Sequence, residues 1–136
     1  MTYLIDKSAW ARLEVPSVAV VLEPLIQDDE IVVCPAFTLE VLYSARNAAD
    51  HRHLRHSLAG FRHVPHTAED WRLAELLQRE LARIGKHRGP GVSDLLLAAT
   101  AITHGLVVLH HDRDFLAIAE VSSTFRQQPV VPFGSL

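Results

Sequence analysis

Three short, continuous apolar runs are separated by segments that have the length and the capping residues of helices. The runs cover residues 3–5, 31–34 and 106–109. Strands that are apolar on both sides are typical of a parallel sheet whose two faces are both covered. Helices between successive strands supply this cover and the long crossovers that parallel pairing needs. The sequence therefore predicts an α/β fold with a mostly parallel central sheet and helices on both faces.

Capping residues indicate where the helices between these runs begin and end. We expect Ser8 to cap a short helix, Thr67 the longest helix and Ser93 an almost wholly apolar one. Gly85 and Gly105 are placed to end the last two of these helices. The expected helices cover residues 9–14, 16–28, 35–47, 50–61, 68–84 and 94–104, with a short helix from residue 113 and an edge strand at 129–133.

The whole chain of 136 residues is expected to form one domain, 1–136, because it contains no repeat and no linker. The single cysteine, Cys34, excludes an internal disulfide and a four-cysteine zinc site, and we expect it to be a buried apolar side chain. Residues 1–25 lack the pattern of a secretory signal peptide, and no stretch is long and apolar enough to cross a membrane. These observations favour a cytoplasmic protein without a membrane partner.

Four acids that lie far apart in the sequence are directed to one rim of the predicted sheet. Asp6 and Asp112 each follow a predicted strand. Asp94 begins a helix that precedes a strand, and Glu40 lies early in a helix that follows one, so both helices begin at that same rim. Ligands of open parallel sheets bind beyond this rim. The sequence therefore predicts that these four acids lie close together, with Asp114 beside them.

The surroundings of these acids favour a cation site over isolated surface charges. Asp94 opens the apolar segment 95–99, and Glu40 is the only charged residue between Pro35 and Ala45. Burying a carboxylate in such surroundings is costly unless it is paired or bound to metal. Each acid alone has an ordinary explanation, such as a favourable charge at a helix N-terminus. Their joint placement favours one or two Mg²⁺ or Mn²⁺ ions, which prefer hard oxygen ligands.

Such a cluster supports hydrolysis of a phosphodiester bond. Asp6, Glu40, Asp94 and Asp112 are the candidate catalytic and metal-binding residues, and Asp114 is a further candidate ligand. A divalent ion lowers the pKa of a water molecule and neutralises charge on the phosphate under attack. With these five acids assigned to the site, 11 of the 16 acidic residues remain, against 13 lysines and arginines in the chain. The formal charge of −3 therefore does not exclude RNA as the substrate.

Hydroxyl and basic side chains near the acids are candidates for contact with the substrate. Ser8 could bond an acid or a phosphate oxygen in addition to capping a helix. Lys86 and Arg88 lie in a glycine-rich loop that is either a guide for an RNA backbone or a polar connector, and Arg113 is a fourth candidate. The basic stretch 51–66 has three interpretations, which are phosphate contact, a solvated helix face and a zinc site.

Four segments resemble, in order, the motifs of PIN domains in VapC toxins. Segment 4–10 resembles their first strand with its acid-x-serine motif, and segments 37–43 and 92–98 resemble the regions that carry the second and third acids. Segment 110–115 resembles the closing pair of acids before a phenylalanine. The resemblance implies a Mg²⁺- or Mn²⁺-dependent endoribonuclease, usually a homodimer, held silent by a VapB antitoxin that often inserts a basic side chain among the acids.

Two other functions are compatible with acids at a sheet edge. A receiver domain would place a lysine after a late strand, where this chain has His110-His111-Asp112, and the opening Asp6-Lys7-Ser8 lacks the second aspartate of the common phosphatase signature. A non-catalytic RNA- or protein-binding module that kept the fold is the other alternative. Acids at every expected position argue against it.

Overall fold

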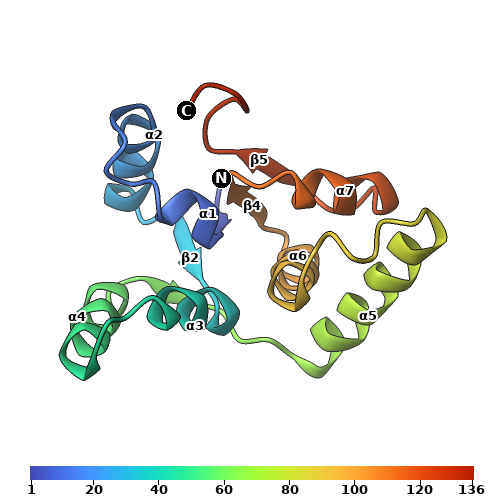
Figure 1. Cartoon of the computed structure of the whole chain (residues 1–136), viewed down its shortest axis with the longest axis horizontal. Helices are drawn as coiled ribbons and strands as arrows, with labels where there is room; N and C mark the ends of the chain where they lie inside the picture. Colours follow the sequence, from blue (N-terminus) through green and yellow to red (C-terminus); the bar gives the residue numbers. More distant parts are fainter.

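The computed structural model describes residues 1–136, and its centre is a five-stranded sheet (Figure 1). The strands are β1 (Tyr3–Ile5), β2 (Ile31–Val33), β3 (Arg62–His63), β4 (Val107–His110) and β5 (Gln127–Pro129). Their order is β3-β2-β1-β4-β5, and every neighbouring pair is parallel. The register places Leu4 opposite Val32 on one side and Val108 on the other. The predicted α/β class with a parallel sheet is confirmed.

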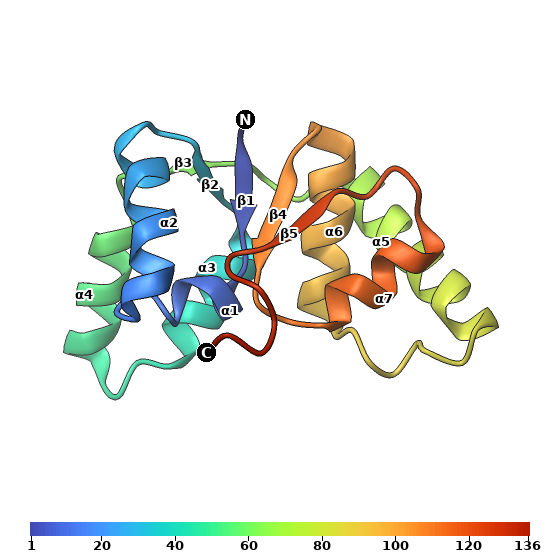
Figure 2. The same cartoon turned by 90° about the horizontal axis from the view of Figure 1, so that it is seen from above.

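Helices cover both faces of the sheet (Figure 2). They are α1 (Lys7–Trp10), α2 (Pro16–Gln27), α3 (Pro35–Tyr43), α4 (Ala48–Leu58), α5 (Ala68–Arg83), α6 (Val92–His104) and α7 (Asp114–Val121). The chain from β1 to β3 carries α1–α4 on one face, and the chain from β3 to β5 carries α5–α7 on the other. None of these helices combines the length and the apolar character that a membrane span requires.

The strand order fixes where a ligand site belongs. The chain starts in the middle of the sheet at β1, adds β2 and β3 on one side, and then crosses back to add β4 and β5 on the other. The direction of winding therefore reverses between β1 and β4. In open parallel sheets the crevice at this switch point, beyond the carboxyl ends of the strands, is where ligands bind. Asp6 and the segment 111–114 follow these two strands directly.

The hydrophobic core extends through both layers of helices. The central strands β1 and β4 are almost wholly buried, and seven successive residues of α6, 95–101, are buried as well. The helix α6 lies between the sheet and α5, so it is apolar on all sides (Figure 2). This packing fixes the start of α6 at the rim of the sheet, where Asp94 lies.

The first short helix is capped by an acid and not by the serine that the sequence predicted. Asp6 is the N-cap of α1, and its Oδ2 accepts the Ser8 N–H at 3.0 Å. The helix ends at Trp10, although the prediction extended it to residue 14. Ser8 lies in the first turn, where its hydroxyl is free to bond elsewhere.

The apolar helix α6 begins two residues earlier than predicted. Its N-cap is Gly91, not Ser93, and it starts at Val92. Asp94 Oδ2 accepts the Gly91 N–H at 3.0 Å. In both α1 and α6 an aspartate, and not the nearby serine, accepts a free N–H group at the start of the helix, because a carboxylate is the stronger acceptor.

The other element boundaries agree with the prediction to differing degrees. Thr67 caps α5 as expected, and the left-handed residues Gly85 (φ 72°) and Gly105 (φ 67°) follow the ends of α5 and α6. The helices α3 and α4 are shorter than predicted. The edge strand lies at β5 (127–129) and not at 129–133, and the edge strand β3 was not predicted.

Cys34 is buried at the N-terminus of α3, as the sequence indicated. Burial raises the pKa of its thiol to about 11, so the thiol stays protonated at neutral pH. A protonated thiol without access to solvent is not a nucleophile. Cys34 therefore serves as a small apolar side chain of the core.

Candidate active site

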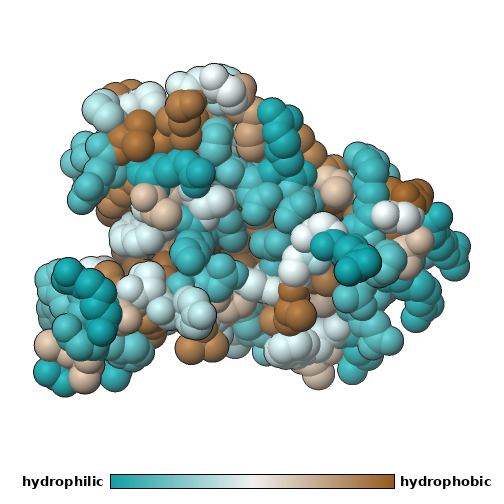
Figure 3. Space-filling view, in the orientation of Figure 1, coloured by the Kyte–Doolittle hydropathy of each residue, from teal (hydrophilic) through white to brown (hydrophobic).

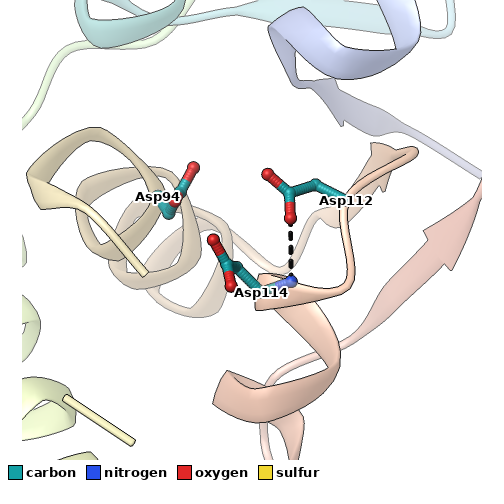
Figure 4. Close-up of side chains that lie close together, drawn as sticks. All are labelled: Asp94, Asp112 and Asp114. Carbon is teal, nitrogen blue, oxygen red and sulfur yellow. Dashed lines mark hydrogen bonds between the residues drawn. The ribbon is translucent and has the colours of Figure 1, made fainter. Parts of the chain in front are cut away.

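Three carboxylates meet at the rim where β4 ends and where α6 and α7 begin (Figure 4). Asp94 comes from the first turn of α6, Asp112 from the connection after β4, and Asp114 is the first residue of α7. One carboxylate oxygen of each lies within 4.8 Å of those of the other two, and the three side chains point toward the same space. We call these three residues the acid cluster.

Asp6 lies next to the acid cluster at the end of β1. Its backbone N–H donates to the Leu109 carbonyl of β4 at 3.0 Å, and the residue is only 4% exposed. Burial raises the pKa of the Asp6 carboxyl, hydrogen bonds from Ser8 oppose this effect, and the charges of Glu40 and Asp112 raise the pKa further. Asp6 is therefore electrostatically coupled both to the acid cluster and to Glu40.

Glu40, like Asp6, lies outside the acid cluster. It is half-buried in α3 and is not among the acids whose oxygens lie within 4.8 Å of one another. Its charge raises the pKa of Asp6, whereas the pKa of Asp94 is raised by Asp6, Asp112 and Asp114. The structure thus groups three predicted acids tightly, places Asp6 beside them, and links Glu40 to them through Asp6.

The site carries negative charge that no basic side chain neutralises. None of the five acids has a lysine, arginine or histidine nitrogen within 4.0 Å in an ion pair. Burial, with the charges of the neighbouring acids, raises the pKa of Asp94 to about 7, against the lowering effect of the Gly91 N–H. Burial and the charge of Asp112 also raise the pKa of Asp114. A bound cation would reverse both effects by stabilising the ionised carboxylates.

Ser8 ties the two central strands together beneath the acids. Its hydroxyl donates to Asp6 Oδ2 at 2.5 Å and accepts the His111 N–H at 2.8 Å. The hydroxyl therefore spans from the end of β1 to the end of β4, and it holds the Asp6 carboxylate in one orientation. The bond to an acid that the sequence suggested for Ser8 is present, whereas its predicted role as N-cap is wrong because Asp6 is the N-cap.

A buried histidine that the sequence analysis missed holds the backbone at Asp112. His110 is 0% exposed, and its Nδ1 accepts the Asp112 N–H at 3.0 Å. Its Nε2 must then carry the proton that it donates to Gln127 Oε1 at 2.6 Å. Burial lowers the pKa of His110, which agrees with a neutral ring. A histidine at the end of an apolar run was the only sequence signal, and nothing pointed to Gln127.

The connection between β4 and α7 is also ordered from within. Asp112 Oδ1 accepts the Asp114 N–H at 2.9 Å, the bond drawn in Figure 4. On the other side, the loop before α6 passes close to Asp114, because a Cβ built on Gly89 would lie 3.2 Å from Asp114 Oδ1. Glycine at position 89 therefore allows this loop to approach the acid cluster.

The basic candidates for substrate contact are placed differently from one another. Lys86 Nζ donates to both carboxylate oxygens of Glu120, at 2.8 and 3.0 Å. The guanidinium of Arg113 lies 4.5 Å from the centre of the Phe133 ring, in a cation–π contact. Arg88 is exposed and makes no ion pair. Arg88 is thus the one of the three whose charge is not already engaged.

The donor set suits a hard divalent cation. It consists of carboxylate oxygens alone, from residues that are buried or half-buried, and the charges of neighbouring acids help to raise the pKa of Asp6, Asp94 and Asp114. Oxygen donors without thiolate or imidazole select Mg²⁺, Mn²⁺ or Ca²⁺ over softer metals. The residues present therefore fit the kind of ion that the sequence analysis expected.

The fold and the site agree with a known family. The model of the PIN domain matches residues 3–121, and the chain belongs to the PIN-domain family. Ribonuclease VapC51 of Mycobacterium tuberculosis is 40% identical over 136 residues, which cover all of this chain and 98% of that protein. Ribonuclease VapC18 of the same organism is 35% identical over 141 residues, covering both chains completely. The resemblance inferred from the four motifs is confirmed.

Solved structures show the same fold at much lower sequence identity. A chain of VapBC2 from Rickettsia felis, bound to a promoter DNA fragment, has a TM-score of 0.76 at 18% identity and covers 95% of this chain and 98% of its own. A chain of VapBC-1 from nontypeable Haemophilus influenzae has a TM-score of 0.76 at 17% identity, with coverages of 96% and 98%.

Proposed function

We propose that this protein is a metal-dependent endoribonuclease of the VapC type, which hydrolyses phosphodiester bonds in RNA. The observation that carries the proposal is the meeting of Asp94, Asp112 and Asp114 beside buried Asp6, with no basic side chain to neutralise them. The relatives named ribonucleases VapC51 and VapC18, which match along the whole chain, support an RNA substrate.

The acid cluster would hold the cation, with Asp6 as a further ligand and Asp114 bound directly or through water. We propose Mg²⁺ or Mn²⁺, in one or two ions, from the all-carboxylate donor set. When bound, such an ion lowers the pKa of a water molecule and offsets the charge of the phosphate. Glu40, which is half-buried in α3 and whose charge raises the pKa of Asp6, would help to hold the metal and to position the attacking water.

The remaining groups of the site keep these carboxylates in place. Ser8 fixes the orientation of Asp6, and neutral His110 fixes the backbone that carries Asp112. Both groups are themselves hydrogen-bonded to a neighbouring element, which fixes their orientation before the substrate binds. Fixed ligands reduce the reorganisation needed to reach the transition state.

A VapB-like antitoxin is the proposed partner that silences the enzyme. Similar folds occur in chains of toxin–antitoxin systems, including VapBC-5 from Mycobacterium tuberculosis, with a TM-score of 0.69 and 22% identity. A basic side chain of the antitoxin would find unpaired carboxylates at the acid cluster and neutralise them. The homodimer implied by the family resemblance stays a prediction.

The test is cleavage of total cellular RNA by the purified, antitoxin-free protein. The reaction is run with Mg²⁺ or Mn²⁺ and separately with EDTA, beside the variant Asp6→Asn, and the cut ends are sequenced. We expect discrete cuts that need metal and are absent from Asp6→Asn. Folded protein that binds Mn²⁺ but leaves this RNA intact would indicate a narrow substrate missing from the pool.

Two other outcomes would favour the alternative functions. A protein that neither cuts RNA nor binds Mn²⁺ would contradict the proposal and favour a non-catalytic binding module. Brisk Mg²⁺-dependent turnover of an aryl phosphate, with RNA left intact, would instead favour a phosphatase.

A further inference from the structure

We infer that the basic helix α4 forms a second RNA-contacting surface. This surface binds the phosphate backbone of the substrate at a distance from the acid cluster. The inference rests on the proposed function, because it assigns to that enzyme the surface that binds its RNA. It concerns residues of α4 and of the connection before it, none of which belongs to the candidate active site.

The region around α4 is rich in basic residues. Residues 46–66 contain four arginines and five histidines, and Asp50 is their only acid. Two of the arginines are neutralised, since Arg46 pairs with Asp50 at 3.4 Å and Arg62 with Asp29 at 3.3 Å. The other two, Arg52 and Arg55, are exposed and form no ion pair.

The free arginines border two adjoining depressions. The first has a volume of about 520 Å³ and is lined in part by Arg46, His51 and Arg52. The second, of about 320 Å³, is lined by Arg52, Arg55, His56 and Ala59. Arg52 borders both, and Arg55 follows it by three residues on the same helix face. Together they form a continuous basic track along α4.

The track begins at the end of the molecule that carries the acid cluster. Figure 2 shows the connection between α3 and α4 at the same end as the loop that leads into α6, and the first turn of α6 carries Asp94. The helix α4 packs against α3, which carries Glu40. Glu40 lies four residues before Ser44, the C-cap of α3, a helix rise of about 6 Å. An RNA chain bound at the acid cluster can therefore continue past α3 to the start of α4.

Charge complementarity favours a phosphate backbone as the occupant. The acid cluster repels a polyanion until cations bind, and the chain as a whole has a formal charge of −3. Arginine guanidinium groups match phosphate oxygens in charge and in fork geometry, and such contacts supply most of the affinity for nucleic acids. In Figure 3 the region of α4 is a predominantly hydrophilic lobe set apart from the rest of this face.

The zinc interpretation of this stretch gains no support from the structure. A metal site of this kind needs at least three histidine, cysteine or acidic side chains with their ligand atoms close together. Only the acid cluster meets this condition, with ligand atoms within 4.8 Å of one another. His53 and His56 thus lack a third ligand. A purely solvated helix face is the remaining alternative, and it differs from the inference in predicting no selective loss of RNA binding.

The test measures RNA affinity in protein that binds without cutting, in an Asp94→Asn background. Fluorescence anisotropy with a labelled single-stranded RNA is recorded over a series of KCl concentrations, for the double variant Arg52→Gln/Arg55→Gln and its parent. We expect weaker binding and a slope of log affinity against log salt that is smaller by about 1.4, because each lost contact with a single-stranded phosphate contributes about 0.7.

The matched control is Arg72→Gln/Arg79→Gln on α5, which removes two arginines that, like Arg52 and Arg55, are exposed and form no ion pair. It should keep the parent slope, and the charge-preserving Arg52→Lys/Arg55→Lys should keep it too. Equal slopes for the α4 glutamine variant and the α5 control would overturn the inference. So would an unchanged RNA slope combined with lost binding of poly-glutamate, which would assign α4 to an acidic protein partner.

The same variants separate this inference from the proposed function. RNA binding that depends on Arg52 and Arg55, in a protein whose unsubstituted form never cleaves RNA with metal, would support the binding surface and contradict the nuclease. Metal-dependent cleavage with RNA binding that is indifferent to both arginines would support the nuclease and contradict the surface.

Discussion

Two aspartates on the same face of the sheet, Asp70 of α5 and Asp94 of α6, differ in what surrounds their carboxylates. Asp70 is 0% exposed, and it accepts hydrogen bonds from the Thr67 N–H at 2.9 Å and the Thr103 hydroxyl at 2.6 Å. Thr100 adds a third donor at 3.3 Å. Although burial acts to raise it, these bonds lower the pKa of Asp70 below its ordinary value.

Asp94 receives much less compensation. Burial raises its pKa to about 7, the charges of the neighbouring acids add to this effect, and the hydrogen bond from the Gly91 N–H opposes it. The comparison teaches that burial alone does not identify a functional acid. The number of hydrogen-bond donors to the carboxylate distinguishes the two cases. Asp70 is stabilised by donors within the fold, whereas Asp94 lacks them and is suited to bind a cation.

The network around Asp70 also explains how the other face is joined to this one. Thr100 Oγ1 lies 2.7 Å from His66 Nδ1, and His66 Nε2 accepts the Ala36 N–H at 3.0 Å. Because Nε2 accepts, Nδ1 carries the proton, and burial lowers the pKa of His66 in agreement with a neutral ring. This chain of bonds connects the start of α5, the middle of α6 and the start of α3.

Substitution of the two aspartates is expected to differ most in its effect on the rate of RNA cleavage. Asp94→Asn should abolish metal-dependent RNA cleavage while the protein stays folded, because it removes a proposed cation ligand. Asp70→Asn should retain cleavage in the fraction that folds. Rates measured on a single RNA, with circular dichroism of each variant, check this expectation. Normal cleavage by Asp94→Asn would contradict the assignment of Asp94 as the functional acid of the two.

The pH dependence of stability should separate the two residues next. The pKa of Asp94 is raised in the folded protein, so its contribution to the free energy of unfolding is present below about pH 4 and is lost as the pH rises through about 7. Metal-free protein should therefore become less stable than Asp94→Asn over that range, by at most about 4 kcal/mol. Mn²⁺ should reverse the loss. Urea unfolding at several pH values measures it.

Removal of the Asp70 carboxylate should lower the free energy of unfolding, whereas removal of the Asp94 carboxylate should not. Asp70→Ala leaves the Thr67 N–H without its acceptor and removes the shortest hydrogen bond of the Thr103 hydroxyl, which should lower the free energy of unfolding by about 2–3 kcal/mol. Asp94→Ala, measured without metal at pH 8, should be no less stable than wild type. Equal losses in the two variants would show that both aspartates are structural.

A smaller effect is expected at Ser8. Ser8→Ala removes the hydroxyl that holds Asp6 Oδ2 and that accepts the His111 N–H. Cleavage should fall by about 10- to 100-fold, the usual effect of losing a group that orients a metal ligand. Ser8→Thr keeps the hydroxyl and should recover most of the rate. A rate unchanged in Ser8→Ala would mean that Asp6 needs no support.

The smallest expected effect is at Gly89. A Cβ at this position lies 3.2 Å from Asp114 Oδ1, so Gly89→Ala should displace that carboxylate by a few tenths of an ångström. Because a misplacement of about 1 Å costs on the order of 100-fold, we expect a loss of less than about tenfold in cleavage. Gly60→Ala, where a Cβ meets nothing within 4 Å, is the matched control for the exchange itself.

Much of the fold could be predicted because its signals are local. The continuous apolar runs located β1, β2 and β4 to within a residue, and Thr67, Gly85 and Gly105 marked helix ends through their own backbone chemistry. The strand β3 could not be predicted, since it consists of two exposed polar residues that pair only because β2 offers an edge. Tertiary pairing, not propensity, makes this strand.

The candidate site was predictable as far as topology determines it. Parallel strands must bring their carboxyl ends to one rim, so the convergence of Asp94, Asp112 and Asp114 follows from sequence order and strand direction. The wider position of Glu40 and the support that His110 receives from Gln127 depend on side-chain geometry between elements. No local pattern encodes such contacts, so they required the structure.

The most direct test of the cation site is isothermal titration of Mn²⁺ into antitoxin-free protein at pH 7, in buffers of different ionisation enthalpy. At this pH the Asp94 carboxyl is partly protonated. We therefore expect Mn²⁺ binding accompanied by proton release, with both signals lost or strongly reduced in Asp94→Asn and kept in Asp70→Asn. Mn²⁺ binding by Asp94→Asn with the affinity and proton release of the wild type would contradict the assignment of the acid cluster as the metal site.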